Sequence, residues 1–179
     1  MKMNVHQLAL CAVLTALALS LSYLENMFPT ALLIPLPGFK LGLANIVTVF
    51  ALYYLGPAPA MTIFVARCLL GAMFAGNVSA LLFSLMGGVL AMLIMILLHR
   101  LPGLSIYGVS IAGAAGHNIG QVAAAVVTLG TAAAVAYLPI LLVVSVFTGA
   151  LTGFIAALLF AAMDKTKLGG TAYGTSTGK

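Results

Sequence analysis

The stretch APAMTIFVARCLLGAMF, from Ala58 to Phe74, indicates a helix that crosses a membrane, and it carries one charge, Arg67. A charged side chain at membrane depth costs roughly 2.5 kcal/mol or more, so it usually faces a protein interior or a watery cavity instead of lipid. Arg67 is therefore a candidate for a site that recognises a polar group. The alternative is that its side chain snorkels to the membrane interface or braces a pair of helices.

The composition of the whole chain agrees with a membrane protein. Of its 179 residues, 64% are hydrophobic and only 5% are charged, which is too few charges to cover a soluble surface. The net charge of +5 comes from basic residues near the ends of apolar runs, so membrane topology explains it better than a nucleic-acid partner does. Cys11 and Cys68 lie in apolar runs without metal-type spacing and are predicted to be packing residues.

Six apolar runs approach the length of about 20 residues that a transmembrane helix needs. The predicted runs are Leu8–Leu24, Lys40–Leu55, Ala58–Phe74, Ser79–Leu98, Ser105–Leu129 and Ala136–Met163. The first run has no small-residue cleavage pattern after it, so we interpret it as a retained helix. The sequence thus predicts an all-α integral membrane protein, with one six-helix domain over residues 1–164 and a flexible polar tail over residues 165–179.

The basic residues orient these runs. With the N-terminus inside, five basic flanking residues lie inside and Lys40 alone lies outside, as the positive-inside rule requires. The five inner residues are Lys2, Arg100, Lys165, Lys167 and Lys179. We therefore expect both termini on the cytoplasmic side. The connection Glu25–Phe39 then lies outside, and because it is apolar and holds three prolines we expect it to cover the outer face; the alternative is an anchor on the lipid headgroups.

Small residues at four-residue spacing allow membrane helices to pack closely. Such ladders occur in the fifth and sixth runs, where packing inside the bundle is expected. The ladders are Ala112, Gly116, Gly120 and Ala124, and Gly149, Gly153 and Ala157. The first run carries Ala12, Ala16 and Ser20 together with further small residues on its other faces. This pattern fits contact with its own bundle alone and contact with a second protein as well, and it does not choose between the two.

Polar residues in the predicted outer half and midplane of the bundle accompany Arg67. The candidate substrate-binding residues are Arg67, Lys40, Asn45, Asn77, His117, Asn118 and Gln121. We expect them to line a cavity open to the outside. There the two cations would hold an anionic or carbonyl group of a ligand, and the amides would form hydrogen bonds to its other polar groups. The alternatives are a structural role for His117 and interhelical hydrogen bonding for Asn118 and Gln121.

The chain lacks the residues that several kinds of catalysis and metal binding require. Glu25 and Asp164 are the only acids and lie far apart, so there is no acidic magnesium site and no paired-acid centre. A nucleophile triad and a Walker loop are also missing. The protein is therefore expected not to be an enzyme, to hold no metal or cofactor, and to need a partner ATPase for any energised transport.

The run Pro35-Leu36-Pro37-Gly38-Phe39-Lys40-Leu41-Gly42-Leu43-Ala44-Asn45 resembles the Gx transporter family, some members of which are labelled heptaprenyl diphosphate synthase component I. The resemblance extends to Arg67 with Gly71, to Gly76-Asn77 and to His117-Asn118-Gly120-Gln121. That family is similar to the S components of energy-coupling factor transporters. These are six-helix binding proteins of the bacterial plasma membrane, which dock on a transmembrane coupling subunit and two ATPases.

The resemblance implies a multi-pass membrane protein that binds a small vitamin-like or cofactor-precursor-like molecule for uptake. It also implies that Ala12, Ala16 and Ser20 contact the coupling subunit. The alternative is a non-catalytic accessory subunit in isoprenoid or quinone metabolism, because the chain lacks the acidic motifs of prenyl diphosphate synthesis. Neither the residues nor the resemblance determines the substrate.

Overall fold

The computed structural model describes residues 4–27, 42–76, 78–130 and 132–165, and within them it contains six α-helices, one 3-10 helix and no strand. The helices are α1 Val5–Met27, α3 Leu43–Tyr54, α4 Pro57–Ala75, α5 Val78–His99, α6 Ile106–Leu129, η1 Ala132–Tyr137 and α7 Leu138–Lys165. Each predicted apolar run overlaps one of the α-helices, with ends that differ by no more than three residues. The run at Lys40–Leu55 gives the shortest, since α3 has 12 residues.

Glycines with positive φ end the helices at the predicted breaks. Gly76 closes α4 at φ 60° and Gly130 closes α6 at φ 64°, a backbone conformation that residues with a Cβ rarely adopt. Gly56, at φ 92°, precedes α4, and Pro57 takes the first helical position, where its missing N–H would have had no partner.

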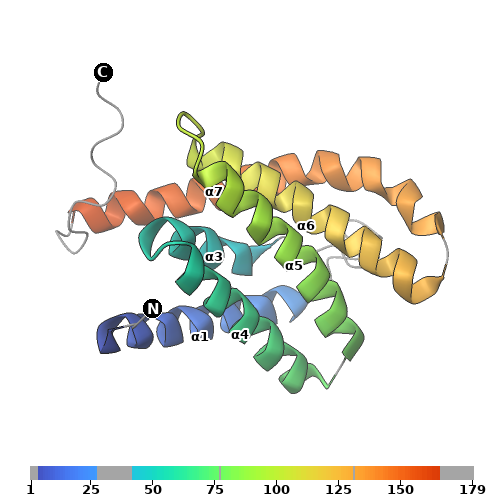
Figure 1. Ribbon diagram of the computed structural model, residues 1–179, viewed down its shortest axis with the longest axis horizontal. Coiled ribbons are helices and arrows are strands. Elements are labelled where there is room, and N and C mark those ends of the chain that lie inside the picture. The colour runs from blue at the N-terminus through green and yellow to red at the C-terminus, as the bar shows by residue number, and fades with distance from the viewer. Residues whose placement is uncertain (1–3, 28–41, 77, 131, 166–179) are drawn as a thin grey trace.

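Successive helices run in alternating directions (Figure 1). The ends of α3, α5 and α7 lie at the end of the bundle where α1, α4 and α6 begin. Ring contacts join the three helix ends, because Tyr53 lies 4.4 Å from the His99 ring and 6.4 Å from the Phe160 ring between centroids. Arg100 and Lys165 lie at this same end of the helices. The arrangement is the one that alternating membrane crossings require, and the cytoplasmic placement of this end stays a prediction.

Among the residues that the structure describes, four segments are long and apolar enough to cross a membrane: Val5–Glu25, Pro57–Phe74, Leu81–His99 and Ala132–Lys165. The protein is therefore a multi-pass membrane protein by the length and composition of its helices. The crossings by α3 and α6 stay predictions, because α3 is about 18 Å long at 1.5 Å per residue and α6 carries polar residues in its middle.

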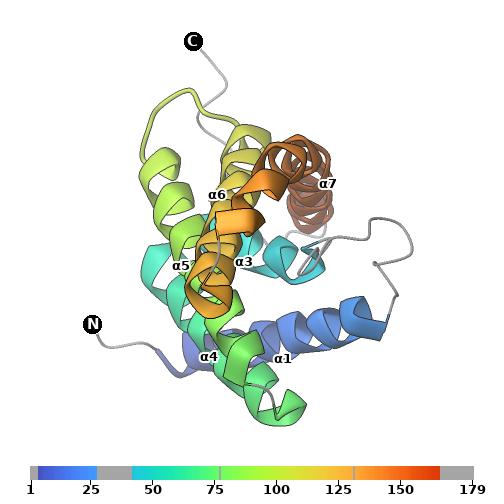
Figure 2. The ribbon, with the colours of Figure 1, turned by 90° about the vertical axis from the view of Figure 1, so that its right-hand side faces the viewer.

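Viewed along the bundle, α5, α6 and α7 pack together on one side, α1 and α4 lie on the other, and α3 fills the space between them (Figure 2). Glycines bring the first group into close contact. A Cβ on Gly120 would lie 2.5 Å from the Met86 carbonyl oxygen of α5, and one on Gly149 would lie 2.5 Å from the Ile111 Cα of α6. The predicted packing of the small-residue ladders in α6 and α7 is thus confirmed.

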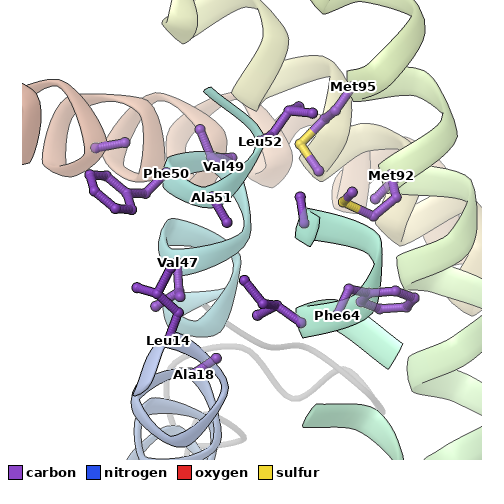
Figure 3. Packing of buried hydrophobic residues seen from close by; sticks show 14 of the residues in the cluster. Leu14, Ala18, Val47, Val49, Phe50, Ala51, Leu52, Phe64, Met92 and Met95 are labelled. Carbon is purple, nitrogen blue, oxygen red and sulfur yellow. The ribbon is translucent and has the colours of Figure 1, made fainter. Parts of the chain in front are cut away.

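The apolar core lies where α1, α3, α4 and α5 meet (Figure 3). Leu14 and Ala18 of α1 face Val47 of α3, and Phe64 of α4 lies near Met92 of α5. The two cysteines are buried without a disulfide, as expected of packing residues. This core fixes α1, α3 and α4 relative to each other, and these three helices carry the site.

Candidate functional site

Arg67 lies in the second half of α4, one helical turn before Gly71, and its guanidinium is held by two other helices. Nη1 donates a hydrogen bond to Ser22 Oγ of α1, and Nη2 donates one to Asn45 Oδ1 of α3, both at 3.3 Å. Charge-assisted bonds of this type are usually 2.7–2.9 Å long, so both are weak. The buried Nε has no hydrogen-bond partner among the described residues. The guanidinium therefore does not use all of its hydrogen-bonding capacity on the described residues.

Glu25 brings a negative charge to the same place. Its side chain is only 4% exposed, and its carboxylate interacts electrostatically with Arg67. The carboxylate oxygen Oε1 also accepts a 2.6 Å hydrogen bond from the backbone N–H of Gly42, the residue that precedes α3. Glu25 thus joins the last turn of α1 to the start of α3 and partly balances the charge of Arg67.

Phe64 supports the guanidinium from within α4. The Arg67 Cζ atom lies 5.4 Å from the centroid of the Phe64 ring, a cation–π arrangement. The ring is 1% exposed and packs directly against Gly88 of α5, which leaves no room for a Cβ there. We call Ser22, Glu25, Asn45, Phe64 and Arg67 the Arg67 cluster.

A cavity of about 810 Å³ lies beside this cluster, between α1 and α4. We call it the α1–α4 cavity; the residues that line it are Leu19, Ser20, Ser22, Tyr23, Leu24, Gly71 and Phe74. Most of its wall is apolar, and Ser22 is shared with the Arg67 cluster. Pockets that bind small molecules usually have volumes of 300–1,000 Å³ and a few polar groups in an apolar wall, which this cavity matches.

The predicted polar residues of α6 lie elsewhere. Gln121 and His117 pack against Gly87 of α5, where a Cβ would lie 2.9 Å from Gln121 Cγ and 3.1 Å from His117 Cε1. Asn118 donates a 2.9 Å hydrogen bond from Nδ2 to the Leu141 carbonyl of α7. Asn118 therefore joins two helices, as one of the two sequence-based interpretations held. The expected single group of polar residues is divided between the Arg67 cluster, the α5–α6 interface and the α6–α7 interface.

Of the remaining predicted residues, Asn45 lies in the Arg67 cluster. Lys40, Asn77, the tail after Lys165 and most of the connection Glu25–Phe39 lie outside the described residues. Ala12, Ala16 and Ser20 are exposed on one face of α1. The sequence did not identify Ser22, Glu25 or Phe64 as site residues. The only available signal was that Glu25 is one of two acids in the chain and lies at the end of an apolar run.

The fold and the site define a multi-pass helical membrane protein with a half-buried arginine beside a largely apolar cavity. A family model described as heptaprenyl diphosphate synthase component I matches residues 14–159. The chain therefore belongs to the heptaprenyl diphosphate synthase component I family. No curated protein and no solved structure matches it. The similarity to S components stays a prediction.

Proposed function

We propose that this protein is a non-catalytic membrane subunit that holds an amphiphilic ligand with an anionic head, of the isoprenoid phosphate type, for a partner enzyme. The family name supports the partner, since a component I implies at least one other component of the synthase. The protein would supply the membrane site and the partner the chemistry.

The observation that carries this proposal is the junction of the α1–α4 cavity with the Arg67 cluster at Ser22. A largely apolar wall with a guanidinium bonded to one of its lining residues, Ser22, is complementary to a molecule with an apolar body and one anionic group. Arginine suits phosphate in particular, because its planar fork of N–H groups binds two phosphate oxygens at once. Nη1 and Nη2 of Arg67 make only weak hydrogen bonds of 3.3 Å, so these are the donors that a phosphate would take.

The positions of the acids support a non-catalytic role. Transfer of a prenyl diphosphate depends on magnesium, which carboxylates hold in such sites. Glu25 already accepts the Gly42 N–H and faces Arg67, while Asp164 lies in the last turn of α7. Since these are the only two acids of the chain, bond making and breaking is expected in the partner.

The exposed face of α1 supports a docking role. Ala12, Ala16 and Ser20 let another helix approach closely, and Ser20 also lines the α1–α4 cavity. A partner on this face would therefore lie beside the ligand. That position suits a subunit that passes its ligand to another protein.

Co-purification tests the proposal. The protein is expressed in its native host with a purification tag, and proteins that purify with it are identified by mass spectrometry before and after the change Ala16→Leu. We expect a prenyl synthase that is lost in Ala16→Leu but kept in the control Ala123→Leu, which adds the same bulk to an exposed position of α6. Native mass spectrometry of the same sample should show a bound phosphate-bearing lipid.

A second candidate is an S-component-like carrier that binds a vitamin or cofactor precursor and is energised by partner ATPases. The same exposed face of α1 favours it, because a coupling subunit would need such a surface. The co-purification experiment separates the two functions. Coupling-factor ATPases in place of a prenyl synthase, together with a water-soluble ligand, would support the carrier and refute the accessory subunit.

A further inference from the structure

We infer that the α1–α4 cavity opens sideways to the bilayer and takes the single apolar chain of a ligand that enters from the lipid. This inference rests on the proposed function, because it assumes an anionic head at Arg67. It adds the source of the ligand, its route and its orientation.

The location of the lining residues is the first observation that supports a lateral opening. All the described residues that line the cavity belong to α1 and α4, so the cavity lies on the flank of the bundle and not along its centre. Two lining residues, Tyr23 and Phe74, are 67% and 78% exposed. On the flank of a membrane-spanning bundle, exposed aromatic and aliphatic side chains face lipid. The side of the cavity formed by Tyr23 and Phe74 is therefore open to the bilayer.

The location of the polar groups is the second observation, and it determines the orientation of the ligand. Ser22 lines the cavity and accepts a hydrogen bond from the half-buried guanidinium of Arg67, which also donates one to Asn45 Oδ1 inside the bundle. The cavity is thus polar on its inner side and apolar toward the lipid. A ligand with one anionic head and one apolar chain fits in one orientation only, with its head at Arg67 and its chain between the two helices.

The third observation is that Gly71 leaves space between α1 and α4 for an apolar chain. The nearest atom to a Cβ added at Gly71 is Leu19 Cδ1 at 3.5 Å, an ordinary van der Waals distance. Alanine therefore fits at this position without moving its neighbours. A leucine side chain would extend into the α1–α4 cavity, and we use it to block the apolar chain of the ligand.

The test compares three probes that share parts of one structure: farnesyl diphosphate, farnesol and inorganic diphosphate. Binding to the full-length protein in phosphatidylcholine nanodiscs is measured by competition against a labelled prenyl diphosphate and by thermal shift. We expect farnesyl diphosphate to bind at least about tenfold more tightly than either fragment, since burial of the apolar chain adds to the binding of the head. Gly71→Leu should weaken farnesyl diphosphate binding about tenfold and leave inorganic diphosphate unchanged, while the control Ala123→Leu should change neither.

A second experiment covers the case in which Gly71→Leu does not fold. Cysteines are placed at Tyr23 and Phe74 and joined by a flexible bismaleimide; the native Cys11 and Cys68 are buried and should not compete. Joining the two sides should slow the uptake of farnesyl diphosphate from vesicles. Either single cysteine variant, treated in the same way, should take it up at the normal rate.

Three results would overturn the inference. Equal affinity for inorganic diphosphate and farnesyl diphosphate would show that the cavity does not hold the chain, although an anion site at Arg67 would remain. Equal competition by phosphatidylglycerol would show an ordinary membrane lipid in the cavity. Uptake that is unaffected by the joined cysteines would exclude the lateral route. By contrast, the absence of binding by every diphosphate probe would contradict the proposed function itself.

Discussion

The guanidinium carbon of Arg67 lies 5.4 Å from the centroid of the Phe64 ring. The same ring packs against Gly88 of α5, and the contact is so close that Gly88 has no space for a Cβ. A charge on α4 is therefore positioned by a residue on another helix, through an aromatic ring that neither donates nor accepts a conventional hydrogen bond.

Gly88→Ala should consequently lower the affinity for a diphosphate ligand. The new methyl group displaces the Phe64 ring and with it the guanidinium, and we expect a loss of severalfold to tenfold in affinity, measured by thermal shift and competition binding. Adding Phe64→Leu to Gly88→Ala should restore thermal stability, because leucine makes room, but it should not restore full affinity, because the cation–π contact is gone.

The matched control is Gly116→Ala. A Cβ at Gly116 would lie 2.5 Å from Ile94 Cδ1, so overpacking occurs there too, but at the α5–α6 interface. This variant should lose thermal stability and keep its affinity. If Gly116→Ala and Gly88→Ala weakened binding equally, general loosening of the bundle would explain both, and the positioning role of Gly88 would be wrong.

Arg67→Ala should reduce diphosphate binding about tenfold to a hundredfold, because a hydrogen bond to a charged group contributes about 1.5–3 kcal/mol. Arg67→Lys should keep part of the affinity through its charge and lose the forked geometry. Arg100→Ala is the control, since Arg100 is exposed just after α5. Isothermal titration against farnesyl diphosphate checks the prediction, and unchanged affinity in Arg67→Ala would remove Arg67 from the site.

Glu25→Gln should increase the affinity for a diphosphate severalfold. The change removes a negative charge that opposes an anionic ligand beside Arg67, and the glutamine oxygen still accepts the Gly42 N–H. Asp164→Asn, in the last turn of α7, removes the same charge away from the cluster and should have no effect. Weaker binding by Glu25→Gln at unchanged thermal stability would show that Glu25 helps to hold the ligand instead of opposing it.

Asn118→Leu should destabilise the protein by about 1 kcal/mol and leave diphosphate affinity unchanged. The substitution removes the hydrogen bond to the Leu141 carbonyl between α6 and α7, and interhelical hydrogen bonds in membranes average about 0.6 kcal/mol. Reversible unfolding in mild detergent measures the stability. A large loss of affinity with normal stability would return Asn118 to the group of ligand-binding residues.

The helices were predictable from the sequence because lipid restricts the choice of structure. Backbone groups must bond within each membrane segment, so an apolar run of sufficient length becomes a helix, and Gly56, Pro57 and Gly76 mark where helices begin and end. The packing role of Gly120 and Gly149 was predictable for the same reason, since close helix contacts need residues without side chains.

The site was only partly predictable. Arg67 was identified because a charge among apolar residues is costly wherever the helix lies, and Asn45 because an amide in an apolar run needs a partner. His117 and Gln121 have the same sequence signature, yet they lie at the contact with Gly87. Residue type and depth do not specify which face of a helix meets which neighbour.

The sequence by itself thus determined that this is a helical membrane protein, where its helices lie along the chain, and that Arg67 needs a polar environment. The tertiary structure decided which residues provide that environment. They are Ser22 and Glu25 of α1 and Asn45 of α3, which lie 22 to 45 residues before Arg67 in the sequence. It also decided that a cavity lies between α1 and α4. The physical reason is that apolar periodicity fixes local helical structure, whereas contacts between helices depend on the rotation and crossing of each pair.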